Sequence, residues 1–178
     1  MSNEYLEIFL YMALASLIII IYSWIRCKYT TLSDPLSLHL FGLKNTAMSS
    51  VLDGWSISHF IFYFLFGLYY PTKINFIIGM GVLWELFEYL TSNSNIKILS
   101  NIRGISRCNV GSDENVNGDW FYAKISDIFV NALGALLGYY LSRSSSVRYI
   151  IREFGVTPSK ICTSTFILFI LTIYKYNY

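Results

Sequence analysis

The sequence predicts an all-α fold: an integral membrane bundle of four to five transmembrane helices, formed as a single domain by residues 1–178. The first observation behind this prediction is composition, because 54% of the residues are hydrophobic and only 13% are charged, whereas charged residues make up about a quarter of a soluble domain. The second is the length of the apolar runs, several of which approach the roughly 20 residues that cross a bilayer as a helix. We therefore expect a multi-pass protein located in a membrane.

Residues 5–25 form the first predicted span. The run has the length of a membrane crossing, and Tyr22 and Trp24 stand near its end, where aromatic side chains favour the membrane interface. A secretory signal peptide begins with basic residues, whereas this run begins with Glu4 and Glu7. We therefore expect an uncleaved helix that anchors the protein and packs against the other spans.

Residues 56–70 and 74–90 form the second and third predicted spans. Pro71 and the polar residues beside it separate the two runs, which is typical of a tight turn. The third run therefore returns to the side of the membrane from which the second started. Gly79 and Gly81 lie within the third run and are predicted to permit close approach of a neighbouring helix.

The second half of the chain alternates polar and apolar segments. Residues 91–123 are rich in Asn, Ser and Gly and predict an irregular polar loop, either solvated or acting as a lid. The fourth predicted span covers residues 125–141, and residues 142–160 form a basic, serine-rich connector. Residues 161–174 form a fifth apolar run that is short for a crossing, so the expected number of spans is four or five.

The sequence argues against several classes of site. The net charge of +2 is too small to suggest nucleic-acid binding, and the three cysteines form no closely spaced pair of the kind found in zinc ribbons. The acidic stretch of the polar loop does not match the calcium loop of an EF-hand. The sequence also contains no nucleophilic Ser or Cys motif and no glycine-rich phosphate loop.

The ionisable residues of the second, third and fourth predicted spans gather at one face of the membrane. Because successive spans alternate in direction, the start of the second, the end of the third and the start of the fourth lie at the same face. Those three places hold the residues that we single out: Asp53, His59, Glu85, Glu88, Asp127 and Asn131. Glu85 and Glu88 are three residues apart, so a helix presents both on one face. An ionised carboxylate at membrane depth is normally paired, protonated or bound to a cation.

This group of side chains has the composition of a metal-assisted catalytic site. Oxygen-rich ligand sets suit Ca²⁺, Mg²⁺ or Mn²⁺, and the predicted ligands are Glu85, Glu88, Asp127, Asn131 and Asp53. The predicted catalytic residues are His59, Glu85, Glu88 and Asp127. Since the site lies at the depth of phospholipid head groups, a general base beside a cation predicts transfer or hydrolysis of a head group, with membrane lipids as partners.

The same residues resemble those of a known family. The pattern is carried by Asp53 with Ser58-His59, by Glu85-Leu-Phe-Glu88, and by Asp127-Ile-Phe-Val-Asn131-Ala-Leu-Gly134-Ala-Leu-Leu-Gly138. It is similar to the VanZ-like superfamily of small polytopic membrane proteins and, more distantly, to base-exchange phosphatidylserine synthases, over residues 53–141. The resemblance implies lipid head-group chemistry, with His59 as the base, Glu85 and Glu88 as its acid partners, and Asp127 as a metal-binding or orienting carboxylate.

Two other interpretations stay open at the level of sequence. A lone histidine on an apolar helix is more often a packing residue than a ligand, and the acids could form a buried structural network in a non-enzymatic scaffold or envelope protein. Intramembrane acids are also typical of transporters, although here they gather at one face and line no path to the midplane. Whether the protein is an enzyme is therefore not decided by its sequence.

Overall fold

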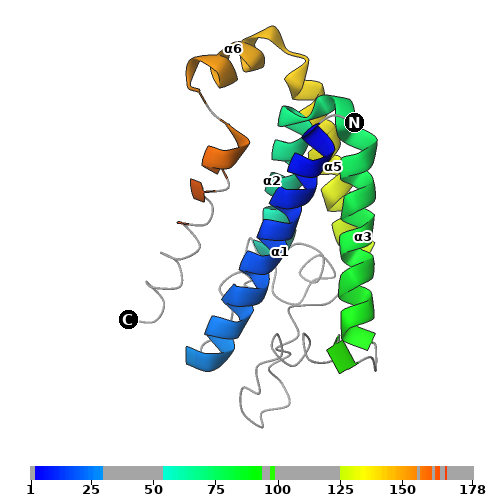
Figure 1. Ribbon diagram of the computed structural model, residues 1–178. Helices are drawn as coiled ribbons and strands as arrows, with labels where there is room; N and C mark the ends of the chain where they lie inside the picture. Colours follow the sequence, from blue (N-terminus) through cyan, green and yellow to red (C-terminus); the bar gives the residue numbers. More distant parts are fainter. Residues whose placement is uncertain are drawn as a thin grey trace, which may run out of the picture.

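Every element in the described part of the protein is helical. The computed structural model describes residues 3–29, 54–93, 97–98, 125–155, 157–161, 163–164 and 167. No strand occurs among these residues, so the all-α prediction is confirmed for them. Figure 1 shows α1, α2, α3 and α5 running along one direction, with the shorter α6 across one end.

The helices coincide with four of the five predicted apolar runs. Their bounds in chain order are α1 (Asn3–Tyr29), α2 (Gly54–Tyr69), the 3₁₀ turn η3 (Pro71–Lys73), α3 (Ile74–Asn93), α5 (Ile125–Ser142) and α6 (Ser145–Glu153). The fifth run at residues 161–174 lies largely outside the described residues, as do most of the polar loop at residues 91–123 and the predicted ligand Asp53.

Three stretches of these helices are long and apolar enough to cross a membrane: Asn3–Tyr22, Pro71–Thr91 and Ile125–Ser142. Their lengths of 20, 21 and 18 residues are close to the roughly 20 residues that span a bilayer. The structure is therefore consistent with the membrane location that the sequence predicts.

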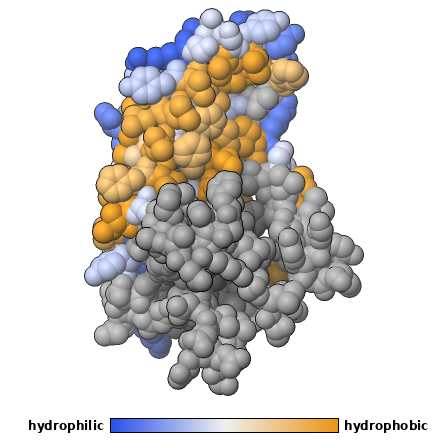
Figure 2. Space-filling view, turned by 180° about the vertical axis from the view of Figure 1, so that it is seen from behind, coloured by the Kyte–Doolittle hydropathy of each residue, from blue (hydrophilic) through white to orange (hydrophobic). Residues whose placement is uncertain are grey.

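The surface of the helices is largely apolar, and several polar side chains are buried between the helices, unlike in a typical soluble protein. In α3, Leu83 and Leu86 are 56% and 48% exposed, whereas Glu85 is only 3% exposed. In α5, Phe129 is 70% exposed and Asp127 is 4% exposed. Figure 2 shows hydrophobic residues as a broad band over the described surface, with hydrophilic residues near its upper end. A surface of this kind suits lipid tails as its solvent.

The chain reverses direction between α2 and α3 at Pro71. Proline disfavours helical geometry in the residue before it, and Tyr70 accordingly leaves the helical region, with φ −123° and ψ 55°. Pro71 then opens the single turn η3, where its missing N–H leaves no helical hydrogen bond unmade. The turn makes α2 and α3 antiparallel neighbours, as the spacing of the two apolar runs predicts.

The most extensive contact between helices joins α2 and α5. Gly134 faces the carbonyl group of Phe60, and one turn later Gly138 faces that of Phe64, so the two helices run in the same direction. A Cβ atom at either glycine would collide with the facing carbonyl oxygen, and a Cβ at Gly67 would collide with the backbone of α5. Small residues therefore let the two backbones touch, as at other membrane-helix contacts.

The prediction for the two glycines of α3 holds at Gly81 and is wrong at Gly79. A Cβ at Gly81 would lie 3.2 Å from the ring of Tyr63 and 3.4 Å from Cβ of Asn131, so this glycine permits close contact with α2 and α5. A Cβ at Gly79 would have no atom of the described residues within 4 Å. Because the two glycines are two residues apart, they point about 200° apart around the helix, and only one can face the bundle.

A buried apolar cluster joins all four long helices: Ile8, Met12, Tyr63, Phe66, Tyr70, Ile77 and Ala135. Aromatic pairs attach α1 along its length. The ring centroids of Tyr5 and Phe76 are 5.1 Å apart, and those of Tyr22 and Trp55 are 5.9 Å apart. The second pair brings α1 to the start of α2, next to the polar residues described below.

Candidate functional site

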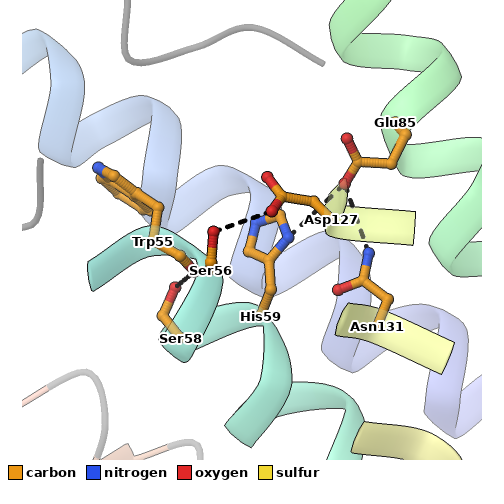
Figure 3. Close-up of polar contacts among 7 residues, drawn as sticks. All are labelled: Trp55, Ser56, Ser58, His59, Glu85, Asp127 and Asn131. Atoms are coloured by element: carbon orange, nitrogen blue, oxygen red, sulfur yellow. Dashed lines mark hydrogen bonds and ion pairs between the residues drawn. The ribbon is translucent and has the colours of Figure 1, made fainter. Parts of the chain in front are cut away.

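Three helices bring polar side chains together at one end of the bundle. α2 and α5 begin at this end and α3 ends there, so His59 lies in the second turn of α2, Asp127 in the first turn of α5, and Glu85 in the second half of α3. One ligand atom from each of these three side chains lies within 4.8 Å of those from the other two. Figure 3 shows the side chains pointing toward one another from separate helices.

Polar contacts connect the helices at this point. Nδ1 of His59 lies 3.6 Å from Oε1 of Glu85, an ion pair when the imidazole is protonated. Nδ2 of Asn131 donates a hydrogen bond to the same Oε1 at 3.4 Å, and Oγ of Ser56 donates to Oδ1 of Asp127 at 2.9 Å. A shift of any one helix would break at least one of these contacts. We call these five residues the polar cluster (Figure 3).

The polar cluster is buried. Ser56, Glu85, Asp127 and Asn131 are 1%, 3%, 4% and 2% exposed, and the side chain of His59 is 12% exposed. Removal of a carboxylate from water costs several kcal/mol unless other groups compensate. When both carboxylates are ionised, one imidazole can balance only one of their two charges, which favours the binding of a cation or a proton.

The ends of two helices add to the electrostatic field of the cluster. Asp127 lies in the first turn of α5, where the positive end of the helix dipole stabilises a negative charge by about 0.3–1 kcal/mol. α2 begins at the same end of the bundle. Two positive helix ends therefore lie near the cluster, and they stabilise negative charge there, whether it belongs to a side chain or to a bound phosphate.

A second layer lies one helical turn deeper in the bundle. Tyr63 follows His59 by four residues on α2, and Gly81 precedes Glu85 by four residues on α3. Tyr63 is only 4% exposed, and its ring packs against Gly81. The hydroxyl group of Tyr63 is within electrostatic range of both Glu85 and Glu88. Tyr63 therefore lies between the polar cluster and the rest of the buried apolar cluster.

Glu88 lies beside the cluster rather than inside it. It is 7% exposed and stands three residues after Glu85, so both acids face the bundle. It is not among the residues whose ligand atoms lie within 4.8 Å of one another. Of the residues singled out in the sequence, the structure brings together four: His59, Glu85, Asp127 and Asn131. It places Glu88 next to them, and Asp53 lies outside the described residues.

Sequence reasoning missed Ser56 and Tyr63. Ser56 precedes His59 by three residues and Tyr63 follows it by four, so all three share the face of α2 that carries the site. That spacing is the signal that could have identified them. It was weak because serine and tyrosine are common in the apolar runs of this chain.

The donor set of the cluster fits a hard divalent cation. Glu85 and Asp127 offer carboxylate oxygens and His59 offers a ring nitrogen. Oδ1 of Asn131 is buried and accepts no hydrogen bond from any residue that the structure describes, which leaves it available as a further oxygen donor. Oxygen donors suit Ca²⁺, Mg²⁺ and Mn²⁺.

Comparison with known proteins identified no relative of this chain. No protein-family model, no curated protein and no solved structure matches the chain. The resemblance to VanZ-like proteins therefore stays a prediction from the pattern of residues.

Proposed function

We propose that the protein is an integral membrane enzyme that acts on phospholipid head groups with the help of a divalent cation. One observation carries the proposal: His59, Glu85 and Asp127 come from three helices of an apolar bundle, and their ligand atoms lie within 4.8 Å of one another. Ionisable groups at membrane depth are costly and are usually functional. The donor set offers both a general base and oxygen ligands for a cation.

The position of the polar cluster supports a lipid substrate. It lies toward the end of the bundle where α2 and α5 begin and α3 ends, and in the proposal this end is the one that meets the phospholipid head groups. The positive ends of α2 and α5 favour a phosphate at this level. In the proposal, a lipid would approach this site along the bilayer.

Each residue has a distinct role in the proposal. Glu85, Asp127 and Oδ1 of Asn131 would hold the cation, which would supply charge stabilisation to the phosphate oxygens of a bound lipid. His59 would take the proton from the attacking water or alcohol as its oxygen bonds to phosphorus, and would return it to the alcohol that leaves when the original P–O bond breaks. Glu85 lies 3.6 Å from Nδ1 of His59, so it would also orient the imidazole and balance its positive charge.

The proposal includes α2 as a fourth crossing, although its 16 residues extend only about 24 Å. The end of α2 leads through η3 into α3, a candidate span. The start of α2 touches the start of α5, another candidate span, through Ser56 and Asp127. α2 therefore joins the same two faces as its neighbours. A fifth crossing by residues 161–174 stays a prediction from the sequence.

A structural network is the rival function, and one observation favours it. Both carboxylates already accept a hydrogen bond from a neighbouring helix, Asp127 from Ser56 and Glu85 from Asn131. In a scaffold protein these bonds would serve only to hold α2, α3 and α5 in register. The two functions differ in whether lipids change when the protein is present.

Lipid mass spectrometry of membranes from cells that express the protein tests the proposal. The wild type is expected to change the abundance of one head-group class. His59→Gln should slow this change by about 10²–10⁴-fold, the usual effect of losing a general base. Glu85→Gln should abolish it. The matched control is Glu4→Gln, which makes the same chemical change at the opposite end of the bundle, where the side chain is 46% exposed.

The melting temperature of each variant in detergent separates the two functions. Variants that melt like the wild type but leave the lipids unchanged support the enzyme. Full turnover in Glu85→Gln with Asp127→Asn would contradict it. So would a wild type that alters no lipid while the same variants lose stability, which is the result that a structural network predicts.

A further inference from the structure

The connector predicted for residues 142–160 contains a well-defined helix, α6. It follows a short turn after α5, in which the N–H of Ser144 donates to the carbonyl group of Leu141 at 3.0 Å. It ends at Glu153. Two residues later, Gly155 has a φ of +54°, in the left-handed region, and its N–H donates to the carbonyl group of Arg152 at 3.2 Å. Figure 1 shows α6 running across the end of the bundle instead of continuing along α5.

One face of α6 is apolar and largely uncovered. Val147, Ile150, Ile151 and Phe154 follow the spacing of three and four residues that places side chains on one side of a helix. Val147 and Ile151 are half-buried. Ile150 is 51% exposed and Phe154 is 74% exposed, so half of this face is free to contact something outside the described residues.

Basic side chains border one side of the apolar face. Arg148 and Arg152 are one turn apart, and both are exposed. Glu153 is the only acidic residue in α6. Lys160 adds a further positive charge at the end of the helix, where its Nζ donates to the carbonyl group of Gly155 at 2.7 Å. The helix therefore combines an exposed apolar strip with excess positive charge.

We infer that α6 is a membrane-surface helix that binds anionic phospholipids. Its apolar face lies among the upper acyl chains, and Arg148 and Arg152 contact the negatively charged head groups. This occupant is favoured because only two residues separate the end of the candidate span Ile125–Ser142 from the start of α6, which places α6 at the surface of a membrane crossed by that span. An apolar strip bordered by arginines is typical of helices that lie in the interface of an anionic leaflet. The inference does not depend on the proposed function.

Quenching by lipids locates the apolar face. An environment-sensitive fluorescent amino acid is placed at Phe154 or, as the matched control, at Tyr149 in the full-length protein reconstituted into vesicles. Both residues are aromatic and strongly exposed, 74% and 65%, but they point about 140° apart around the helix. Brominated phospholipids should quench the probe at 154 and not the probe at 149, whereas aqueous iodide should do the reverse.

Lipid composition then tests the choice of anionic lipid. Two sets of vesicles contain the same fraction of either brominated phosphatidylglycerol, which is anionic, or brominated phosphatidylcholine. The brominated phosphatidylglycerol should quench the probe at 154 at least about twofold more strongly, because each nearby arginine attracts anionic lipid. Arg148→Gln with Arg152→Gln should remove this preference. Lys73→Gln, at the same end of the bundle but already paired with Glu4 at 3.4 Å, should preserve it.

Three results would overturn the inference. Iodide quenching at 154 equal to that at 149 would put the apolar face in water. Protection of 154 from both iodide and brominated lipid would mean that a protein, such as a second copy of the chain, covers it. Equal quenching by the two brominated lipids in the otherwise wild-type protein would leave a membrane-surface helix without a preference for anionic lipid.

Discussion

At the scale of single residues, the hydroxyl group of Ser56 holds the carboxylate of Asp127. The hydrogen bond of 2.9 Å is buried and joins residues 71 positions apart in the sequence. It is the contact that fixes the start of α2 against the start of α5 within the polar cluster. Its loss leaves a buried carboxylate oxygen with one donor fewer, in surroundings where water does not replace the donor freely.

We predict that Ser56→Ala lowers the free energy of unfolding by about 1–2 kcal/mol, the range for a hydrogen bond to a buried charged group or between membrane helices. Ser58→Ala is the matched control, because Ser58 lies two residues away on the same helix and its hydroxyl donates only to the carbonyl group of Trp55 at 2.7 Å. Ser58→Ala should lower the free energy of unfolding by a few tenths of a kcal/mol at most, because a backbone carbonyl group within a helix keeps its helical hydrogen bond when the serine hydroxyl is removed. Unfolding in mixed detergent micelles measures the free energy of unfolding of both variants. Equal decreases would show that the hydrogen bond of Ser56 does not hold the helices together.

At the scale of elements, the pairing of α2 with α5 sets the geometry of the site. These two helices carry His59 and Asp127, and their backbones touch at Gly134 and Gly138. The contact lies one to three turns deeper than the cluster. Any change that separates the two backbones should therefore also move the base away from the carboxylate.

Alanine substitutions at two glycines are expected to have opposite effects on stability. Gly138→Ala places a methyl group against the carbonyl oxygen of Phe64 and should destabilise the bundle by about 1–3 kcal/mol, as overpacking does elsewhere. Gly79→Ala meets no described atom within 4 Å and should be neutral or stabilising by up to about 1 kcal/mol, because alanine is the better helix former. Melting temperatures in detergent provide the comparison. A Gly138→Ala protein as stable as Gly79→Ala would contradict the tight α2–α5 contact.

At the scale of the whole molecule, much of the helical architecture could be predicted from the sequence. Helices need an apolar run of fixed length to cross a membrane, so the runs identified α1, α3 and α5 within a few residues of their observed ends. The alternation of direction also predicted which face holds His59, Glu85 and Asp127. Both arguments depend on position along the chain, which a sequence states directly.

Features that depend on the rotation of a helix were harder to predict. Gly79 and Gly81 looked equivalent, but only Gly81 points into the bundle, because two residues turn a helix by about 200°. Tyr63 and Ser56 belong to the site through the face of α2 that they share with His59. The apolar positions of α6 are separated by arginines, so the short helix resembled a polar connector until its geometry was known.

The described helices expose apolar side chains and bury their polar cluster. Leu83 and Leu86 face outward on either side of the buried Glu85, and the same alternation recurs around Asp127. Buried carboxylates of this kind are compensated by a paired group, a proton or a bound cation. The central proposal is that a divalent cation supplies this compensation where the three helices meet.

Binding of Mn²⁺ to the purified protein in lipid nanodiscs is the most direct measurement of that claim, because electron paramagnetic resonance distinguishes free from bound ion. The wild type should bind Mn²⁺ at one saturable site per chain, Glu4→Gln should retain it, and the Glu85→Gln/Asp127→Asn variant should lose it. A folded wild type that binds no Mn²⁺, or a double variant that binds as the wild type does, would contradict the account.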